Sequence, residues 1–264
     1  MALIAEFGKI CERAARAGGQ VLREHAGRVE AREKKPADLV TEADVASQRT
    51  IRDTILAEFP GHGFLGEENE SIPPGPDGLR WIVDPLDGTT NFVHGIPEYA
   101  VSIGLEQNGK LVVGVVYAPV YDACYLAAAG EGAFLNREPL KASRTTDLSQ
   151  AVVATSFPPR ANRNATEVQR FLEVLPRCRA TRRTGSSALN LCSVAAGRFD
   201  AFWSYDTKPW DVAAGALIVR EAGGILTGPG GGDFNVLEAS FVAAATRQLH
   251  RELCQVLATA GPGK

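Results

Sequence analysis

Apolar side chains at helical spacing predict amphipathic helices at both ends of the chain and close to its start. Residues 2–25 place apolar positions three or four apart with charged residues between them, and residues 42–59 and 248–258 repeat the pattern. Thr41 followed three residues later by Asp44 is a variant capping box, which predicts where the second of these helices begins.

Short apolar runs between turn residues predict strands, and further helices alternate with them. In the first half the strand-like runs cover residues 62–68, 99–105, 111–118 and 121–128. Asn108-Gly109, between two of these runs, is a hairpin signal. The charged segment 28–35 fits either a strand or an exposed connection, and residues 71–78 predict a surface loop. In the second half we expect strands over residues 151–155, 199–203 and 240–245, and helices over 164–175, 186–196 and 211–220.

This mixture of helices and strands predicts a layered α/β or α+β fold. A length of 264 residues suits one large unit, which we divide into halves at about residues 1–145 and 146–264. Hydrophobic residues make up 45% of the chain and charged residues 22%, which are ordinary proportions for a folded protein with a sizeable core.

Charge and cysteine content exclude several classes of function. A net charge of −3 and a pI of about 5.9 argue against nucleic-acid binding, which needs a basic surface. The five cysteines are scattered without a Cys-x-x-Cys pair, which argues against a disulfide framework and a zinc site. The sequence shows no signal-peptide pattern and no run of about 18 apolar residues, so we expect a cytoplasmic protein without membrane association.

The stretch from Trp81 to Phe92 carries the first candidate chemistry. An apolar run ends at Asp84, a proline turn brings Asp87 three residues later, and Gly88-Thr89 opens the next segment. Two carboxylates within several ångströms repel by on the order of 4 kcal/mol at an effective dielectric of about 20, so a cation between them is expected. Carboxylate and carbonyl oxygens suit magnesium, calcium or manganese. The alternative is a plain turn, because Asp, Pro and Gly are common turn residues.

Acidic residues predominate in the chain around this stretch. Between residues 59 and 109, eight acidic side chains accompany one basic side chain, Arg80. The eight are Glu67, Glu68, Glu70, Asp77, Asp84, Asp87, Glu98 and Glu106. This local excess of negative charge supports a cation site over a plain turn.

Two helix starts in the second half carry further candidate groups. Gly185-Ser186-Ser187-Ala188 begins a predicted helix with small residues and free amides, so it fits either an anion site or an ordinary N-cap. Asp211 begins the helix that ends at Gly223-Gly224, and an aspartate in that position is commonly a cap. A four-arginine cluster, typical of a solvated surface, precedes the first helix start at Arg177, Arg179, Arg182 and Arg183.

Four separated segments resemble, in order and spacing, the signatures of the inositol monophosphatase family. They are Asp38–Asp44 (DLVTEAD), Gly66–Glu68 (GEE), Trp81–Phe92 (WIVDPLDGTTNF) and Trp210–Gly215 (WDVAAG). The likeness extends from about residue 3 to residue 258. It implies a layered αβαβα sandwich of the sugar-phosphatase type, magnesium-dependent hydrolysis of a phosphate monoester, a homodimer and sensitivity to lithium.

The resemblance also implies a set of metal ligands drawn from three of these segments. The set is Glu67, Asp84, the carbonyl of Leu86, Asp87 and Asp211. Asp84 would bridge two magnesium ions, and Glu67 would also lean toward a third, weaker one. Neighbours in an extended segment point in opposite directions, so only one of Glu67 and Glu68 faces the site, and the resemblance selects Glu67.

Catalytic roles follow from the same likeness. Asp44 and Thr89 would orient and deprotonate the attacking water, with Glu67 as a third catalytic residue. The amides of Gly88 and Thr89 would receive the phosphate. Asp44 and Asp211 would therefore serve the site in addition to capping their helices.

The substrate-binding set implied by the family is Asp87, Gly88, Thr89, Ser187, Ser204 and Asp211. Where the family has a glutamate that accepts hydrogen bonds from the inositol ring, this chain has Ser204. Losing a charge-assisted acceptor costs roughly 1.5–3 kcal/mol, unless Asp206 substitutes for it. Lys34 or Lys35 would match a lysine that the family often places before the Asp38 segment.

The leading hypothesis is a phosphoric monoester hydrolase that converts inositol 1-phosphate to inositol and phosphate. Ser204 keeps open the same chemistry on fructose 1,6-bisphosphate, histidinol phosphate, a nucleotide bisphosphate or NADP. Thr90-Asn91-Phe92, in contrast, resembles the inositol-phosphatase subgroup. A non-catalytic partner of transcription or RNA machinery is the second alternative.

Overall fold

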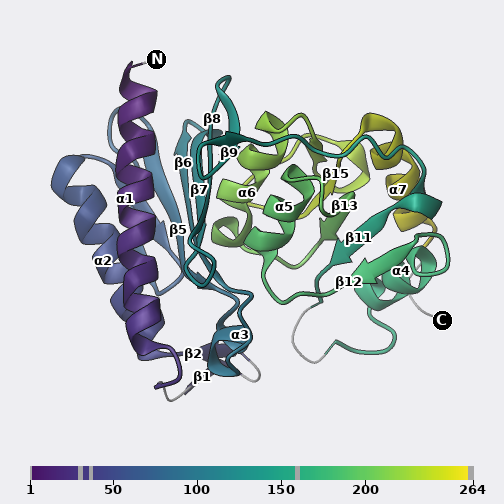
Figure 1. Ribbon diagram of the computed structural model, residues 1–264, viewed down its shortest axis with the longest axis horizontal. Helices are drawn as coiled ribbons and strands as arrows, with labels where there is room; N and C mark the ends of the chain where they lie inside the picture. The colour runs from purple at the N-terminus through teal and green to yellow at the C-terminus, as the bar shows by residue number, and fades with distance from the viewer. Residues whose placement is uncertain (1, 29–31, 36–37, 158–160, 261–264) are drawn as a thin grey trace.

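The computed structural model describes residues 2–28, 32–35, 38–157 and 161–260. Helices and strands are stacked in five layers, α, β, α, β and α, from the N-terminal helices to the C-terminal one (Figure 1). The predicted layered αβαβα sandwich is confirmed.

The first layer contains α1 (Ala2–His25) and α2 (Glu42–Glu58), which pack side by side on one face of the larger sheet (Figure 1). The Thr41 hydroxyl accepts a hydrogen bond from the Ala43 amide, and the Asp44 carboxylate accepts one from the Thr41 amide at 2.8 Å. The predicted capping box therefore forms.

The charged segment between these helices contributes to a small hairpin, in which β1 (Arg32–Lys35) pairs antiparallel with β2 (Asp38–Val40). We predicted either a strand or an exposed connection for residues 28–35, and the last four of these residues form a strand. The side chains of Lys34 and Lys35 lie outside the described part of the molecule.

The larger sheet has eight strands in the order β10-β9-β8-β7-β6-β5-β3-β4. Their bounds are β3 (Gly63–Gly66), β4 (Glu70–Ile72), β5 (Leu79–Asp87), β6 (Ala100–Gln107), β7 (Lys110–Ala118), β8 (Ala123–Ala128), β9 (Gly132–Leu135) and β10 (Glu138–Pro139). Asn108 and Gly109 both have positive φ and close the predicted hairpin between β6 and β7. The segment predicted as a loop from residue 71 begins instead within the edge strand β4.

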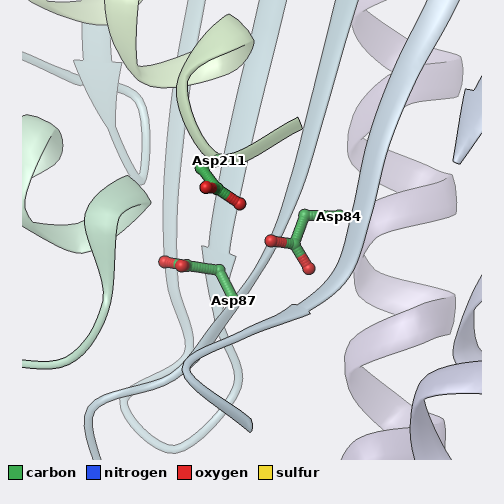
Figure 2. Close-up of side chains that lie close together, drawn as sticks. All are labelled: Asp84, Asp87 and Asp211. Carbon is green, nitrogen blue, oxygen red and sulfur yellow. The ribbon is translucent and has the colours of Figure 1, made fainter. Parts of the chain in front are cut away.

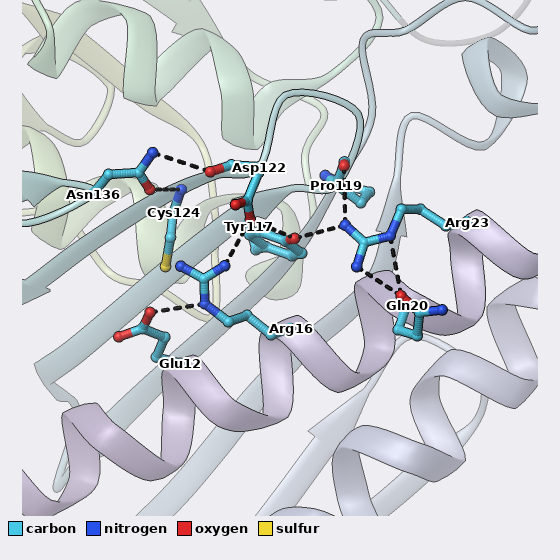
Figure 3. Close-up of polar contacts among 9 residues, drawn as sticks. All are labelled: Glu12, Arg16, Gln20, Arg23, Tyr117, Pro119, Asp122, Cys124 and Asn136. Carbon is cyan, nitrogen blue, oxygen red and sulfur yellow. Dashed lines mark hydrogen bonds and ion pairs between the residues drawn. The ribbon is translucent and has the colours of Figure 1, made fainter.

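Polar contacts attach α1 to the turn after β7 of this sheet (Figure 3). The Arg16 guanidinium lies 2.8 Å from the Asp122 carboxylate, and Arg23 donates a hydrogen bond to the Tyr117 hydroxyl at 2.9 Å. That hydroxyl donates to Asp122 at 2.9 Å, so one carboxylate joins both arginines. These contacts fix how the helix lies across the sheet.

The smaller sheet has five strands in the order β12-β11-β13-β15-β14. Their bounds are β11 (Val152–Thr155), β12 (Ala180–Arg182), β13 (Ala201–Ser204), β14 (Ile225–Thr227) and β15 (Phe241–Ala244). The strands of the first sheet end at residue 139 and those of the second begin at residue 152.

Two helices fill the space between the sheets, α5 (Ser187–Ala195) and α6 (Pro209–Glu221) (Figure 1). All eight residues from Val212 to Val219 are buried, as expected for a helix covered on both sides. The remaining helices are α3 (Thr89–Val93), α4 (Thr166–Val174), α7 (Arg247–Thr259) and the short 3-10 helices η1 (Leu148–Gln150) and η2 (Pro229–Gly231). Within the described part of the chain, every helix is too short or too polar to cross a membrane.

Two glycines let α6 approach the larger sheet closely. A Cβ atom at Gly104 of β6 would lie 2.7 Å from Ala213 Cβ, and one at Gly114 of β7 would lie 2.7 Å from the carbonyl oxygen of Ala214. Nearby, the Ser102 hydroxyl of β6 donates to the carbonyl of Trp210 at 3.1 Å. The sheet thus positions the first turn of α6.

Replacing Gly104 with alanine should destabilise the fold by about 1–3 kcal/mol, because the added methyl overpacks a contact that cannot widen without moving α6. Urea unfolding followed by circular dichroism would show a lower midpoint. Gly61→Ala is the matched control, since a Cβ atom at Gly61 would meet no other atom within 4 Å. Equal midpoints for the two variants would contradict this account of the packing.

Candidate active site

Three carboxylates converge between the end of β5 and the start of α6 (Figure 2). One oxygen each from Asp84, Asp87 and Asp211 lies within 4.8 Å of the others. Asp84 is 2% exposed and Asp87 is 7% exposed, while Asp211 is partly exposed. Oxygens at this spacing can contact a single divalent ion.

An irregularity in β5 places Asp84 and Asp87 near each other. In a regular strand, residues three apart point to opposite faces, but the pairing of β5 with β6 shifts register between these two residues. The Leu86 amide donates to the Asp84 carboxylate at 2.9 Å. The Ser47 hydroxyl of α2 donates to the Pro85 carbonyl at 3.0 Å, so the turn is anchored from outside the sheet.

Burial and mutual repulsion make the negative charges costly. Burial, followed by the charges of Glu67, Asp87 and Asp211, raises the pKa of Asp84 well above its usual value. Burial, then Asp87, raises the pKa of Asp211 to about 8, although the Lys208 amide donates to its carboxylate at 2.8 Å. A cation among these groups would remove the repulsion that disfavours their charged forms.

The start of α5 binds the Asp87 carboxylate. Asp87 accepts hydrogen bonds from the Ser186 hydroxyl, from the Ser187 amide at 3.2 Å and from the Ala188 amide at 2.9 Å. Burial raises the pKa of Asp87 to about 6, and these hydrogen bonds oppose the rise. Ser186 also caps the helix by accepting from the Leu189 amide at 3.2 Å. The start of α5 is therefore both a capped helix end and an anion-binding site, and the anion that it binds is the side chain of Asp87.

Asp44 and Thr89 lie in contact beside the cluster. The Thr89 hydroxyl is 3.2 Å from the Asp44 Oδ1 atom and 3.2 Å from the Leu86 carbonyl oxygen, and it can donate to either. Asp44 is fully buried, and its Oδ2 atom accepts from the Thr41 hydroxyl at 2.6 Å. The capping residue of α2 is thus joined by hydrogen bonds to the first residue of α3.

Glu67 and Glu68 differ in their surroundings. Glu67 follows β3, and its charge is among the causes that raise the pKa of Asp84 and of Asp211. The backbone of Glu68 pairs instead with the side chain of Gln48, at 2.9 Å through its amide and 3.3 Å through its carbonyl. Glu67 is close enough to raise the pKa values of Asp84 and Asp211, but its carboxylate is not one of the three that lie within 4.8 Å of one another.

A small pocket of about 170 Å³ opens beside Asp211. It is lined by Ser156, Phe157, Arg183, Gly185, Ser186, Ser187, Asn190, Asp206, Thr207 and Asp211. Ser187, for which we predict a substrate contact, lines this pocket, and its amide donates a hydrogen bond to Asp87. Sequence reasoning missed Ser156 and Phe157, and it treated Arg183 as part of a surface cluster.

Ser204 does not line this pocket. It is 1% exposed at the end of β13, and its hydroxyl lies 2.6 Å from that of Ser156. The structure thus places Ser204 next to Ser156 rather than on the pocket wall itself, because β13 buries its side chain. Asp206, two residues farther along, lies on the wall itself.

Comparison with known proteins places the chain in a family. The model of the inositol monophosphatase family matches residues 4–261. The chain belongs to this family. It is 45% identical over 234 residues to "Inositol-1-monophosphatase" of Rhizobium meliloti (strain 1021), covering 88% of this chain and 87% of that protein.

Two further proteins are similar to this chain over most of their length. "Nus factor SuhB" of Escherichia coli (strain K12) is 40% identical, with 90% of this chain and 91% of that protein covered. The structure of inositol monophosphatase from Anabaena (Nostoc) sp. PCC 7120 matches with a TM-score of 0.89 at 35% identity, covering 99% of this chain and 98% of that one.

In protein treated with EDTA, the free energy of unfolding should fall as pH rises from about 4 to about 8. The folded protein keeps protons on Asp87 up to about pH 6 and on Asp211 up to about pH 8, whereas the ordinary carboxyl pKa is 3.8. The folded state therefore binds more protons than the unfolded state across this window.

Thermal unfolding at pH 5 and pH 8 measures this dependence. Asp211→Asn should flatten it, because the amide stays neutral at both pH values. A wild-type profile without slope, or an unchanged slope in the variant, would contradict the assignment.

Proposed function

We propose that the protein hydrolyses inositol 1-phosphate to inositol and phosphate as a magnesium-dependent phosphoric monoester hydrolase. The observation that carries the proposal is the convergence of Asp84, Asp87 and Asp211 in a chain of the inositol monophosphatase family. Their donor atoms are all oxygens, and the charges that shift the pKa values of Asp84 and Asp211 are all negative, which fits magnesium.

The proposed ligands for two to three magnesium ions are Glu67, Asp84, the Leu86 carbonyl, Asp87 and Asp211. When bound, magnesium would neutralise the charge of the phosphate oxygens and lower the pKa of the attacking water. The residues of the chain would hold the ions and position the groups that react.

Thr89 and Asp44 would position the attacking water and take up its proton. While the Thr89 hydroxyl donates to Asp44 Oδ1, its oxygen keeps lone pairs that can accept from a water molecule. Asp44 stays oriented because Thr41 holds its other oxygen. Glu67 would be the third member of this catalytic group.

The turn into α3 would bind the phosphate through the amides of Gly88 and Thr89. Gly88 has φ of 98°, and a Cβ atom there would lie 2.8 Å from the Glu98 carbonyl oxygen. Only glycine fits this turn without strain. Asp87, immediately before it, would belong to both the metal and the substrate sites.

The alcohol part of the substrate would enter the pocket beside Asp211 and Ser187. A volume of about 170 Å³ is well below the roughly 300–1,000 Å³ of pockets for drug-sized ligands. A single polyol or sugar ring suits this space better than a nucleotide bisphosphate or NADP. The same chemistry on fructose 1,6-bisphosphate or histidinol phosphate remains the alternative.

Substituting Asp211 with asparagine should lower kcat by about 100-fold or more, because one carboxylate ligand and its charge are lost. Phosphate release from inositol 1-phosphate with magnesium measures this loss, and circular dichroism checks the fold. EDTA should abolish wild-type turnover and added magnesium should restore it.

Glu68→Gln is the matched control for this experiment and should keep most of the activity. Magnesium-independent turnover, or an Asp211→Asn variant as active as this control, would refute the assigned site.

We also propose that both halves act as one phosphatase unit, because the Asp87 carboxylate of the first half accepts hydrogen bonds from the start of α5 in the second half.

Sensitivity to lithium is proposed from membership of the family. A cytoplasmic location is proposed because all five cysteines are free thiols.

A homodimer is proposed from an apolar surface near α3. Ile96 is 45% exposed, and Val120 and Tyr121 are 45% and 56% exposed. Tyr121 lines a recess together with Glu98 and Arg198, so the surface carries charges of both signs. A patch of this kind can pair with its own copy about a two-fold axis.

Tyr121→Asp should shift the protein from dimer to monomer, because it places a charge in the apolar part of the proposed contact. Sedimentation velocity measures the change, with Tyr125→Phe as a control in the same recess that keeps its apolar character. A wild-type protein that sediments as a monomer would rule the dimer out.

A second candidate function comes from relatives named "Nus factor SuhB". Such a role would use a binding surface in addition to the catalytic site. Arg28, Arg32 and Arg49 line one recess next to α2, and they would suit an acidic partner. The overall negative charge does not favour nucleic acid itself.

A further inference from the structure

We propose that Asp206 determines substrate specificity, with its carboxylate accepting hydrogen bonds from the hydroxyl groups of a neutral polyol bound beside Asp211. This inference rests on the proposed function and deepens it. It names the residue that recognises the alcohol part of the substrate rather than its phosphate.

The Asp206 carboxylate is available for a ligand. Asp206 is exposed and lines the same pocket as Asp211. Within the described part of the chain, its carboxylate makes no hydrogen bond or ion pair, and only its amide is engaged, with the Ser204 hydroxyl at 3.5 Å. An ionised carboxylate is an acceptor only, so it suits hydroxyl donors and repels a second phosphate group.

The Ser204 side chain supports the loop that carries Asp206. Its hydroxyl bonds Ser156 at 2.6 Å and accepts from the Asp206 amide, which leaves it little capacity for a ligand. The short side chain turns back onto the loop where β13 ends. Ser204 is therefore a residue that positions the loop. Asp206, in that loop, offers the hydrogen-bond acceptor for the substrate hydroxyls.

The loop itself is held on both sides. The Thr207 hydroxyl donates to the Ala239 carbonyl at 2.6 Å, and the Ser240 hydroxyl donates to the Tyr205 carbonyl at 3.1 Å. The Arg170 guanidinium lies 3.8 Å above the centre of the Tyr205 ring. Asp206 is thus fixed relative to Asp211, five residues farther along, as a specificity site requires.

Arg183 supplies a donor in the same pocket. Its guanidinium lies 6.0 Å from the centre of the Phe157 ring, and in the described part of the chain it forms no ion pair with Asp206. A guanidinium donates and a carboxylate accepts, while each hydroxyl of a polyol can do both. A neutral ring with several hydroxyl groups can therefore use both partners, whereas a second phosphate would gain from Arg183 but meet the negative charge of Asp206.

The test compares two substrates of the same magnesium-loaded enzyme. Inositol 1-phosphate presents ring hydroxyls, whereas 4-nitrophenyl phosphate presents none. Asp206→Asn should raise KM for inositol 1-phosphate about tenfold, as loss of a charge-assisted hydrogen bond does, with kcat changed less than about threefold. Its kcat/KM for 4-nitrophenyl phosphate should stay within about twofold of wild type.

Two further variants control for charge and for the loop. Asp206→Glu keeps the carboxylate and should recover most of the affinity for inositol 1-phosphate. Glu131→Gln removes one exposed negative charge in the turn between β8 and β9, and should leave the ratio of the two substrates unchanged.

The outcomes separate this inference from the proposed function. Normal wild-type turnover with an unchanged substrate ratio in Asp206→Asn would overturn the role of Asp206 alone. An equal loss on both substrates would also overturn it, because the residue would then act on the chemistry or the fold. A wild-type enzyme that hydrolyses only 4-nitrophenyl phosphate would overturn both.

Discussion

Repulsion among clustered carboxylates is the constraint on which the active site depends. Asp84, Asp87 and Asp211 have oxygens within 4.8 Å of one another, so the fold must hold like charges together. Each carboxylate accepts at least one hydrogen bond from a backbone amide. The donors are Leu86 for Asp84, the start of α5 for Asp87 and Lys208 for Asp211. These donors orient the carboxylates without cancelling the repulsion, which leaves the cluster suited to a divalent cation.

The layered architecture is what brings these groups together. The middle helices α5 and α6 lie between the sheets, so their first turns can meet the end of β5. Asn91 joins the halves at this point by donating to the carbonyls of Glu98 and Thr184. A Cβ atom at Gly185 would lie 2.7 Å from the side-chain nitrogen of Asn91, so the turn before α5 also requires glycine.

Local sequence patterns predicted the individual turns and helix starts of this site better than they predicted the contacts between them. The capping box at Thr41, the turn after Asp84 and the start of α5 each follow from a few adjacent residues. Asp87 binds the start of α5 through residues about a hundred positions away in the chain. No local sequence pattern can predict such a contact. The short strands β9, β10, β12 and β14 escaped prediction because their two to four residues depend on neighbouring strands for their conformation.

Ser204 shows that the position of a residue in a motif does not decide where its side chain lies. Its position before Asp211 marked it as a substrate contact, but β13 extends to this residue and buries its side chain against Ser156. The carboxylate available to a ligand is then two residues away, in a loop. The three clustered carboxylates belong to β5 and α6, whereas the pocket beside Asp211 is lined mainly by the segments that follow β11, β12 and β13. Substrate preference can therefore change in these loops while the carboxylate cluster, and with it the hydrolytic chemistry, stays the same.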